Sequence, residues 1–250
     1  MKLKIKPILK IHGGKQIIAS WIASNFPENY KDLCYVEPYC GGASVFVAKD
    51  KSVTEVLNDK NLNLLEIYQC LRDESKEFIR RLSHFKYCEE TFLKIQKKSM
   101  SEDYLERAVN DYVLVKMSRS ELKKSFSKSG ANSWKKSLQE LAELSYRLQD
   151  SFIYNNKALD IIKVFNSENT LLYCDPPYLY ENKTSKTVYS SEMDTNEHIQ
   201  LSHALNSFKG KVVISGITSP LYNRLYKSWN MQKFKGKKTG KKTEVIWKNY

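Results

Sequence analysis

Short apolar runs alternate with helical patterns in the first quarter of the chain and again after residue 150, and this alternation is typical of a parallel α/β sheet. The runs that suit buried strands are 33–37, 53–57, 152–154, 171–174 and 212–215. Helices are expected after them at 43–49, 61–72, 158–165, 195–207 and 219–227. The segments 229–234 and 244–248 flank a turn rich in lysine and glycine, which predicts an antiparallel hairpin closing the sheet.

Between residues 70 and 150 the strand signals vanish and apolar residues recur at helical spacing. Two stripes carry this pattern: Tyr104, Ala108, Tyr112 and Val115, then Leu138, Leu141, Leu144 and Leu148. We predict a helical insertion over 70–150 that divides an α/β domain into the segments 1–69 and 151–250. Strands from both sides of the insertion must then complete one sheet.

The positive charge of the chain is concentrated in two places, within a formal net charge of +13. The first cluster comprises Lys116, Arg119, Lys123, Lys124, Lys128, Lys135 and Lys136, and the second comprises Lys233, Lys235, Lys237, Lys238, Lys241, Lys242 and Lys248. Lysine runs are often only solvated surfaces. Here Phe126, Trp134, Phe234 and Trp247 are interleaved with them, which favours a polyanionic partner, with nucleic acid as the leading candidate.

Several classes of protein are disfavoured by composition. No apolar run approaches the roughly 20 residues that span a bilayer, and the start of the chain lacks the apolar segment of a signal peptide, so a cytoplasmic protein is expected. Five scattered cysteines without a C-x-x-C pair predict neither a disulfide framework nor a zinc site. His198 and His203 are spaced poorly for sharing a helix face, so no metal is expected, and His198 suits a structural role.

The first candidate site is the sequence E-P-Y-C-G-G-A-S, where a predicted strand ends in a Gly-Gly turn that opens a helix. It comprises Glu37, Pro38, Tyr39, Cys40, Gly41, Gly42, Ala43 and Ser44. Glycine lets a ligand approach the backbone, and the helix start offers unpaired N–H groups. Asp59 lies eighteen residues after Gly41, at the end of the next predicted strand, where an acidic residue can accept hydrogen bonds from ribose hydroxyls. A helix N-cap is the alternative role for Asp59.

The glycine pattern is neither G-x-G-x-x-G nor G-x-x-x-x-G-K-[ST]. This absence argues against a dinucleotide or a nucleoside triphosphate. It favours a smaller adenosyl ligand.

The second candidate site is D-P-P-Y, comprising Asp175, Pro176, Pro177 and Tyr178, directly after the apolar run 171–174. Two prolines fix φ and stop the strand, so the carboxylate and the ring are held rigidly at the carboxyl edge of the sheet. Ligands of α/β proteins bind at that edge. A rigid turn without function is the alternative.

Together these motifs resemble the Dam-like family of adenine-specific DNA amino-methyltransferases, in which E-P-x-x-G-G/A-x-S-V-F precedes D-P-P-Y. The segments 10–15 and 244–250 resemble the family's N-terminal cofactor element and its C-terminal strand. The resemblance implies a Rossmann-like methyltransferase sheet and S-adenosylmethionine as cofactor, bound by Gly13, Gly14, Lys15, the 37–44 loop, Asp59, Asn156 and Asp175. Where the family commonly has tryptophan this chain has Ile11, so an aromatic contact to the cofactor is not expected there.

The resemblance further implies a flipped adenine in double-stranded DNA as substrate, a monomer or weak dimer, and a setting such as restriction-modification. Asp175 and the Pro176 carbonyl would accept the two amino hydrogens while Tyr178 stacks on the base. The segment 70–150 would recognise the target, with GATC as the family's common site. The segment 179–194 is polar and longer than most connections, which suits either a loop that orders over the substrate or a plain surface loop.

Three alternatives stay open. The first is amino methylation of RNA or of a protein glutamine, although glutamine enzymes resemble N-P-P-Y. The second is cytosine amino-methylation, whose enzymes usually resemble S-P-P-Y. The third is a non-catalytic DNA-binding relative, which the intact D-P-P-Y element disfavours.

Overall fold

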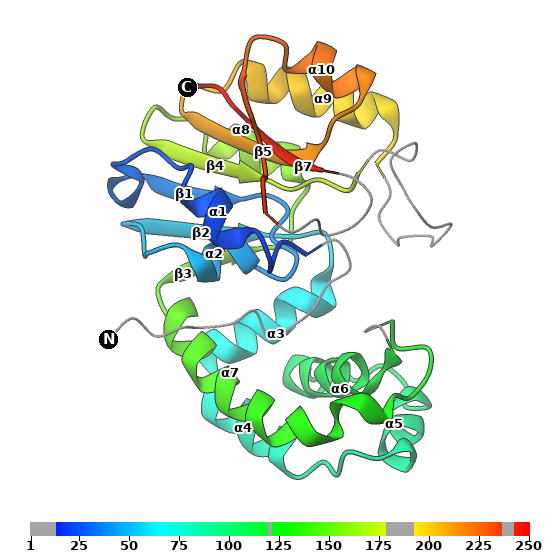
Figure 1. Cartoon of the computed structure of the whole chain (residues 1–250). Coiled ribbons are helices and arrows are strands. Elements are labelled where there is room, and N and C mark those ends of the chain that lie inside the picture. Colours follow the sequence, from blue (N-terminus) through cyan, green and yellow to red (C-terminus); the bar gives the residue numbers. More distant parts are fainter. Residues whose placement is uncertain (1–13, 120–121, 179–192, 237–242) are drawn as a thin grey trace. The chain divides into compact units, whose positions relative to one another are not determined.

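The computed structural model describes residues 14–119, 122–178, 193–236 and 243–250 (Figure 1). The chain divides into two compact units. The first, here called the sheet unit, comprises Ile17–Cys40, Lys49–Lys60 and Tyr154–Tyr250. The second, here called the helical unit, comprises Met1–Gln16, Gly41–Ala48 and Asn61–Ile153. The predicted closing segment falls largely at 179–192, outside the described residues, as do Gly13, Lys237, Lys238, Lys241 and Lys242.

The strands form one seven-stranded sheet with the order β3-β2-β1-β4-β5-β7-β6. Their bounds are β1 Cys34–Glu37, β2 Thr54–Asn58, β3 Ser151–Tyr154, β4 Thr170–Cys174, β5 Lys211–Ile217, β6 Asn230–Lys233 and β7 Glu244–Lys248. β1 pairs in parallel with β2 and β4, and β4 pairs in parallel with β5. β7 is antiparallel to both β5 and β6. The predicted strands and the hairpin are therefore confirmed, and the last strand enters the sheet between β5 and β6.

Helices follow the strands as predicted. In the sheet unit they are α1 Ala19–Ala23, α8 Ala158–Val164, α9 Thr195–Asn206 and α10 Pro220–Leu225, with a short 3-10 helix η1 at Tyr30–Asp32. Local chemistry sets their starts. α9 begins in a capping box, in which the Glu197 amide donates to Asp194 Oδ1 at 2.8 Å and the Asp194 amide donates to Glu197 Oε2 at 2.8 Å.

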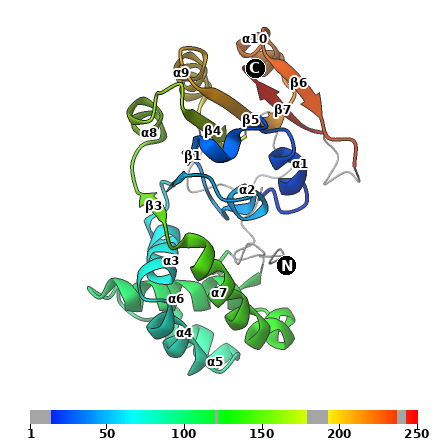
Figure 2. The ribbon, with the colours of Figure 1, turned by 90° about the vertical axis from the view of Figure 1, so that its left-hand side faces the viewer.

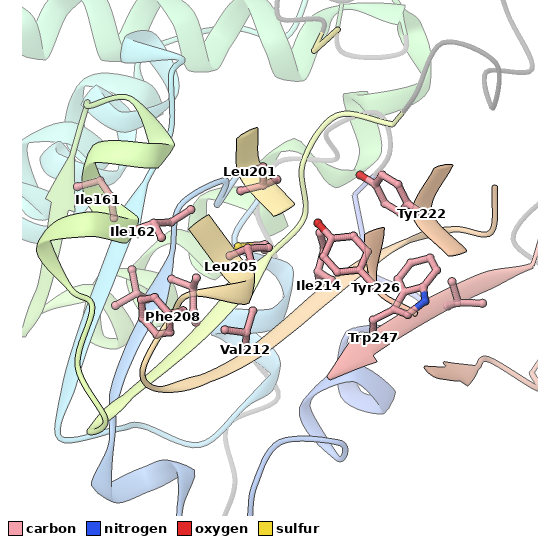
Figure 3. Close-up of a cluster of buried hydrophobic side chains, with 14 of the residues drawn as sticks. Ile161, Ile162, Leu201, Leu205, Phe208, Val212, Ile214, Tyr222, Tyr226 and Trp247 are labelled. Atoms are coloured by element: carbon pink, nitrogen blue, oxygen red, sulfur yellow. The ribbon is translucent and has the colours of Figure 1, made fainter. Parts of the chain in front are cut away.

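One face of the sheet packs against α8, α9 and α10, and α1 lies on the other side of the sheet (Figure 2). Alternate strand residues such as Val36, Leu172, Ile214 and Trp247 point into this core, as period-two alternation requires. Residues from α8, α9 and α10, together with Phe208 and Tyr226 just beyond α9 and α10, complete the cluster, as Figure 3 shows. The helix residues are Ile161, Ile162, Leu201, Leu205 and Tyr222. Burying this apolar surface is the main force that holds the layers together.

His198 belongs to this core. Its ring is buried, and its Nδ1 lies 2.9 Å from the Tyr222 hydroxyl. Burial lowers the pKa of His198, so the ring is favoured in its neutral form. The structural role expected for His198 agrees with this placement.

The helical unit contains α2 Ser44–Ala48, α3 Leu62–Asp73, α4 Ser75–Ser83, α5 Glu89–Gln96, α6 Tyr104–Met117, the 3-10 helix η3 Lys128–Ser133 and α7 Trp134–Leu148. Helix α3 packs against α6 and α7, and α4 packs against α7. From the predicted stripes, Ala108 and Tyr112 on α6 and Leu141, Leu144 and Leu148 on α7 are buried. The helical nature of the insertion is confirmed.

Two of the four aromatic residues expected beside the lysines are core residues. Trp134 is 6% exposed, with its ring between those of Tyr112 (centroids 6.1 Å apart) and Tyr87 (5.8 Å). Trp247 is 2% exposed and lies in the core of the sheet unit. These two rings therefore do not support a polyanionic partner, because they are buried in cores, where large apolar rings are more stable than in water. Phe126 and Phe234 are half-buried and stay partly accessible.

None of the described helices combines the length and the apolar character that a bilayer span requires. All five cysteines are free thiols. Within the described ranges, no group of three or more histidine, cysteine, aspartate or glutamate side chains is arranged to hold a metal ion.

Candidate active site

Three parallel strands of the sheet unit end at the same edge. β1 ends at Glu37, β2 at Asn58 and β4 at Cys174, so Pro38, Asp59 and Asp175 follow at the carboxyl ends. α/β proteins bind their ligands at this edge of the sheet. Glu37 to Cys40 of the first motif and the D-P-P-Y motif are therefore neighbours at this edge, because β1 pairs with β4.

The Asp175 carboxylate is held by a residue from the next strand. Ser215, fully buried on β5, donates to Asp175 Oδ1 at 2.8 Å. The Tyr173 hydroxyl lies 3.0 Å from Ser215 Oγ. Because serine has one hydroxyl proton and a carboxylate can only accept, Tyr173 donates to Ser215 and Ser215 donates to Asp175. Asp175 is thereby fixed in one orientation beside the buried Pro176.

The Tyr178 ring is held from the last strand. Its hydroxyl donates to Glu244 Oε2 at 2.7 Å, and Glu244 begins β7 opposite Ile217 at the end of β5. Burial raises the pKa of Tyr178 well above its usual value, and the charges of Asp175 and Glu244 add to this effect. The ring is a neutral phenol across the physiological pH range.

These groups share one face of the sheet because of period-two alternation. Val213 and Ser215 alternate with core-facing Ile214 on β5, and Glu244 and Ile246 alternate with core-facing Val245 and Trp247 on β7. The face opposite the main hydrophobic core therefore carries the polar side chains at the carboxyl edge. Phe26 covers the same face, with its ring 6.2 Å from that of Tyr173.

Asn58 joins the ends of three chain segments at the β1–β2 side of the edge. Its Nδ2 donates to the Pro38 carbonyl at 2.9 Å and to the Asn156 carbonyl at 3.1 Å, and its Oδ1 accepts from the Asn156 amide at 2.9 Å. Asn155 Nδ2 donates to the Asp59 carbonyl at 2.8 Å. Pro38, Asp59 and Asn156 are thus brought together, with the Asp59 side chain half-buried and that of Asn156 exposed.

The alternative role of Asp59 as a helix cap is wrong. The N-cap of α3 is Asn61, whose side chain accepts from the Leu64 amide at 3.4 Å. Asp59 lies two residues earlier, so its carboxylate is not the N-cap of this helix.

Glu37 is buried at the end of β1 and accepts a hydrogen bond from Tyr35. Burial raises the pKa of Tyr35, with the charge of Glu37 as the second cause, so Tyr35 remains a donor. Lys49 Nζ lies 4.0 Å from the centroid of the Tyr35 ring and pairs with Glu55, which is also buried. Tyr39, two residues beyond Glu37, is half-buried and packs against the hydrophobic core.

The Gly-Gly turn belongs to the helical unit. Gly41 has a φ of 44° and Ala43 has a φ of 50°. Residues other than glycine rarely adopt this region of backbone conformation. The Tyr68 hydroxyl on α3 donates to the Gly41 carbonyl at 2.8 Å and holds the turn. Gly42, Ala43 and Ser44 are buried. In the same unit Gly14 is exposed and Lys15 is 6% exposed.

Five residues of the first basic cluster, Lys116, Arg119, Lys123, Lys124 and Lys128, lie near an antiparallel bridge between Ser118 and Phe126 in the helical unit, and Lys135 and Lys136 lie on α7. Tyr87 supports the bridge by donating to the Ser127 carbonyl at 2.8 Å and the Lys116 carbonyl at 3.2 Å. Lys123 is half-buried and pairs with Asp111. Of the predicted DNA-binding residues, Lys116 is also half-buried, and the exposed ones are Arg119, Lys124, Lys128 and Lys135.

Sequence reasoning missed Asn58, Ser215 and Glu244. Asn58 stands next to Asp59 at a predicted strand end, and that position was a usable signal. Ser215 and Glu244 carry no local signal, because their contacts join residues 40 and 66 positions apart. The resulting site offers a fixed carboxylate and a neutral aromatic ring at one edge, which suits a planar ligand that carries an amino group.

The chain is similar in sequence to known proteins over nearly its whole length. Residues 12–243 match the model of the D12 class N6 adenine-specific DNA methyltransferase family. Type II methyltransferase M1.LlaDCHI of Lactococcus lactis subsp. cremoris is 26% identical over 100% of this chain and 97% of its own length. Type II methyltransferase M.MjaIII of Methanocaldococcus jannaschii is 24% identical, covering 94% of this chain and 93% of its own.

DNA adenine methylase of Escherichia coli (strain K12) is 27% identical, covering 84% of this chain and 77% of its own. Among solved structures, the rRNA methyltransferase aviRa from Streptomyces viridochromogenes aligns with a TM-score of 0.41 and 12% identity over 92% of this chain and 83% of that one. The family match spans nearly the whole chain and includes both motifs of the site. The chain belongs to the D12 class of N6 adenine-specific DNA methyltransferases, and it is an enzyme that methylates adenine in DNA.

Proposed function

We propose that the methyl donor is S-adenosylmethionine and that the target adenine is flipped out of duplex DNA onto Asp175, Pro176 and Tyr178. The observation that carries this proposal is the Ser215 contact, which fixes the Asp175 carboxylate at the carboxyl edge of the sheet. An acceptor that is oriented before the substrate arrives loses no free energy to reorganisation during the reaction.

The proposed roles of the site residues concern the low nucleophilicity of the adenine amino group. The amino nitrogen of adenine is a poor nucleophile because its lone pair is delocalised into the ring. Asp175 and the Pro176 carbonyl accept the two amino hydrogens, which favours a more tetrahedral nitrogen, and Pro177 keeps the turn rigid. Tyr178 stacks as an uncharged ring on the extruded base.

The carboxylates at the edge fit the proposed cofactor. Glu37 and Asp175 place carboxylates at the ends of β1 and β4, which suits a cationic ligand, and the partly accessible Asp59 suits a ribose diol. When bound, S-adenosylmethionine supplies an electrophilic methyl group. The remaining residues that would hold it are Gly13, Gly14, Lys15, Pro38, Tyr39, Gly41, Gly42, Ala43, Ser44 and Asn156.

We assign recognition of the DNA target to the helical segment 70–150. Exposed Arg119, Lys124, Lys128 and Lys135 support this assignment, since lysine and arginine that neutralise phosphates displace counterions. Lys123 contributes less, because it is already paired with Asp111. We place the enzyme in the cytoplasm of a prokaryotic or phage-infected cell, where its DNA substrate lies.

The function is tested by incubating the purified chain with labelled S-adenosylmethionine and duplex DNA, then hydrolysing the DNA and identifying the modified nucleoside by mass spectrometry. The expected product is N6-methyladenine. Methylation-sensitive sequencing of the same DNA then reads the recognised site, for which GATC is the prediction. Label in cytosine, in RNA or in a glutamine peptide instead of DNA adenine would contradict the proposal.

Replacing Asp59 with alanine is expected to weaken S-adenosylmethionine binding at least about tenfold, because hydrogen bonds to a charged acceptor contribute roughly 1.5–3 kcal/mol. Isothermal titration calorimetry measures the dissociation constant. Glu168→Ala is the matched control, because Glu168 is an exposed carboxylate just before β4, at the opposite edge of the sheet. An unchanged constant for Asp59→Ala would remove Asp59 from the cofactor site.

A further inference from the structure

The sheet unit has a groove of about 640 Å³ along its edge strand β6. It is lined by Trp21, Met231, Gln232, Lys233, Phe234, Lys235 and Gly236. The catalytic motif contributes none of these residues. The groove is therefore a separate surface that the site described above does not use.

Two aromatic rings in contact, Trp21 and Phe234, form one side of the groove, here called the aromatic wall. The rings of Trp21 and Phe234 are 5.3 Å apart and meet edge to face at 60°. The Gly236 backbone lies against the Phe234 ring, since a Cβ there would come within 2.3 Å of Phe234 Cζ. Phe234 is thus fixed between an indole ring and a stretch of backbone, and both aromatic rings remain half-exposed.

The groove adjoins the place proposed for the target base. The Phe234 amide donates to the Glu244 carbonyl at 2.9 Å, and the Glu244 side chain accepts from the Tyr178 hydroxyl at 2.7 Å. Only the start of β7 separates the groove from the stacking ring. A DNA strand that leaves the target base passes over one of the surfaces next to Tyr178, and this groove is such a surface.

The charge of the groove fits that strand. Lys233 and Lys235 are exposed on either side of Phe234, and neither forms an ion pair with any residue that the structure describes. Unpaired lysines beside aromatic rings form the arrangement that binds the backbone of single-stranded nucleic acid, with phosphates on the cations and nucleosides against the rings.

We infer that this groove holds the DNA strand next to the flipped adenine, with phosphates on Lys233 and Lys235 and a sugar or base against Trp21. The inference rests on the proposed base flipping at Tyr178. It assigns to the sheet unit a DNA contact separate from target recognition by the helical unit.

The test compares Lys233→Ala/Lys235→Ala with Lys163→Ala/Lys209→Ala, which removes the same charge from exposed lysines that precede β4 and β5 at the opposite edge. Fluorescence anisotropy measures the affinity of each protein for a fluorescein-labelled duplex that carries the recognised site, over a series of KCl concentrations. The slope of log K against log salt is negative, and loss of two phosphate contacts should make it less negative by about 1.8, at roughly 0.9 per contact. The control pair should keep the parental slope.

Two further readouts address the aromatic wall and the reaction. DNA should quench part of the tryptophan fluorescence, and Trp21→Phe, which keeps an aromatic ring against Phe234, should abolish that part. In methyl transfer, Lys233→Ala/Lys235→Ala should raise KM for DNA and leave kcat unchanged, because the groove binds substrate without touching the reacting atoms.

A parental salt slope for Lys233→Ala/Lys235→Ala would overturn the inference, as would a parental quenching signal for Trp21→Phe. A change in sedimentation of the lysine variant without a change in DNA binding would assign the groove to a second copy of the chain and overturn it as well. The binding readouts do not depend on methyl transfer. If the parent protein transfers no methyl group, the proposed function is wrong. The inference that the groove binds DNA is tested separately by the binding readouts.

Discussion

Replacing Asp175 with alanine is expected to slow methyl transfer at least about a hundredfold, the scale for losing one preorganised polar contact in an active site. In the proposed mechanism this substitution removes the acceptor for the target amine, while Tyr178 and the proposed DNA-binding surfaces are left in place. DNA binding should therefore persist. Single-turnover transfer of a labelled methyl group to duplex DNA, at saturating cofactor, measures the effect on the chemical step.

The Ser215→Ala variant tests the orientation of the Asp175 carboxylate separately from its presence. It keeps the Asp175 carboxylate but removes the 2.8 Å hydrogen bond that orients it. The loss should be smaller, on the order of tenfold, because one neutral donor contributes about 0.5–1.5 kcal/mol. Circular dichroism confirms folding in both variants. If a folded Asp175→Ala enzyme transfers methyl groups at the parental rate, the D-P-P-Y motif is only a structural turn and the proposed mechanism is wrong.

Replacing Tyr178 with alanine should instead impair extrusion of the base. Stacking of a base on an aromatic ring contributes about 1–3 kcal/mol, so the flipped population should fall by roughly five- to 150-fold. The fluorescence of 2-aminopurine at the target position reports the flipped state. The rate of methyl transfer should fall in parallel, because the unflipped base does not reach Asp175.

Tyr178→Phe is the control for this variant, because it keeps the ring and removes only the hydroxyl that bonds to Glu244. It should retain most of the flipping signal. If Tyr178→Ala flips adenine as well as the parent enzyme does, another side chain forms the stacking surface. If Tyr178→Phe fails as completely as Tyr178→Ala, the bond to Glu244, rather than the ring, is the essential element.

The elements of the fold were predictable because their signals are local. A run such as Leu171 to Cys174 identifies β4 by its apolar character, and the stripe Leu141, Leu144 and Leu148 identifies the buried face of α7. The rigid turn that carries Asp175 and Tyr178 was also predictable locally, since two adjacent prolines fix the turn whatever surrounds it. Asp59 remained ambiguous, because an acidic residue before a helix suits a cap as well as a ribose.

Burial of individual aromatic residues was less predictable. Trp134 and Trp247 stand among lysines in the sequence, yet both rings point into cores, because neighbouring residues on a helix or strand face different directions. The lysines in the sequence therefore indicated a positively charged surface, but they did not indicate which aromatic rings lie on that surface.

By itself the sequence determined the strands, the helices, the D-P-P-Y turn and the family to which they belong. Only the tertiary structure decided which residues hold the site. Ser215 reaches Asp175 because β5 lies beside β4, and Glu244 reaches Tyr178 because β7 enters the sheet between β5 and β6. The physical reason is that strand order and register depend on packing of the whole sheet. A hydrogen bond between residues 40 or 66 positions apart therefore leaves no local pattern in the chain.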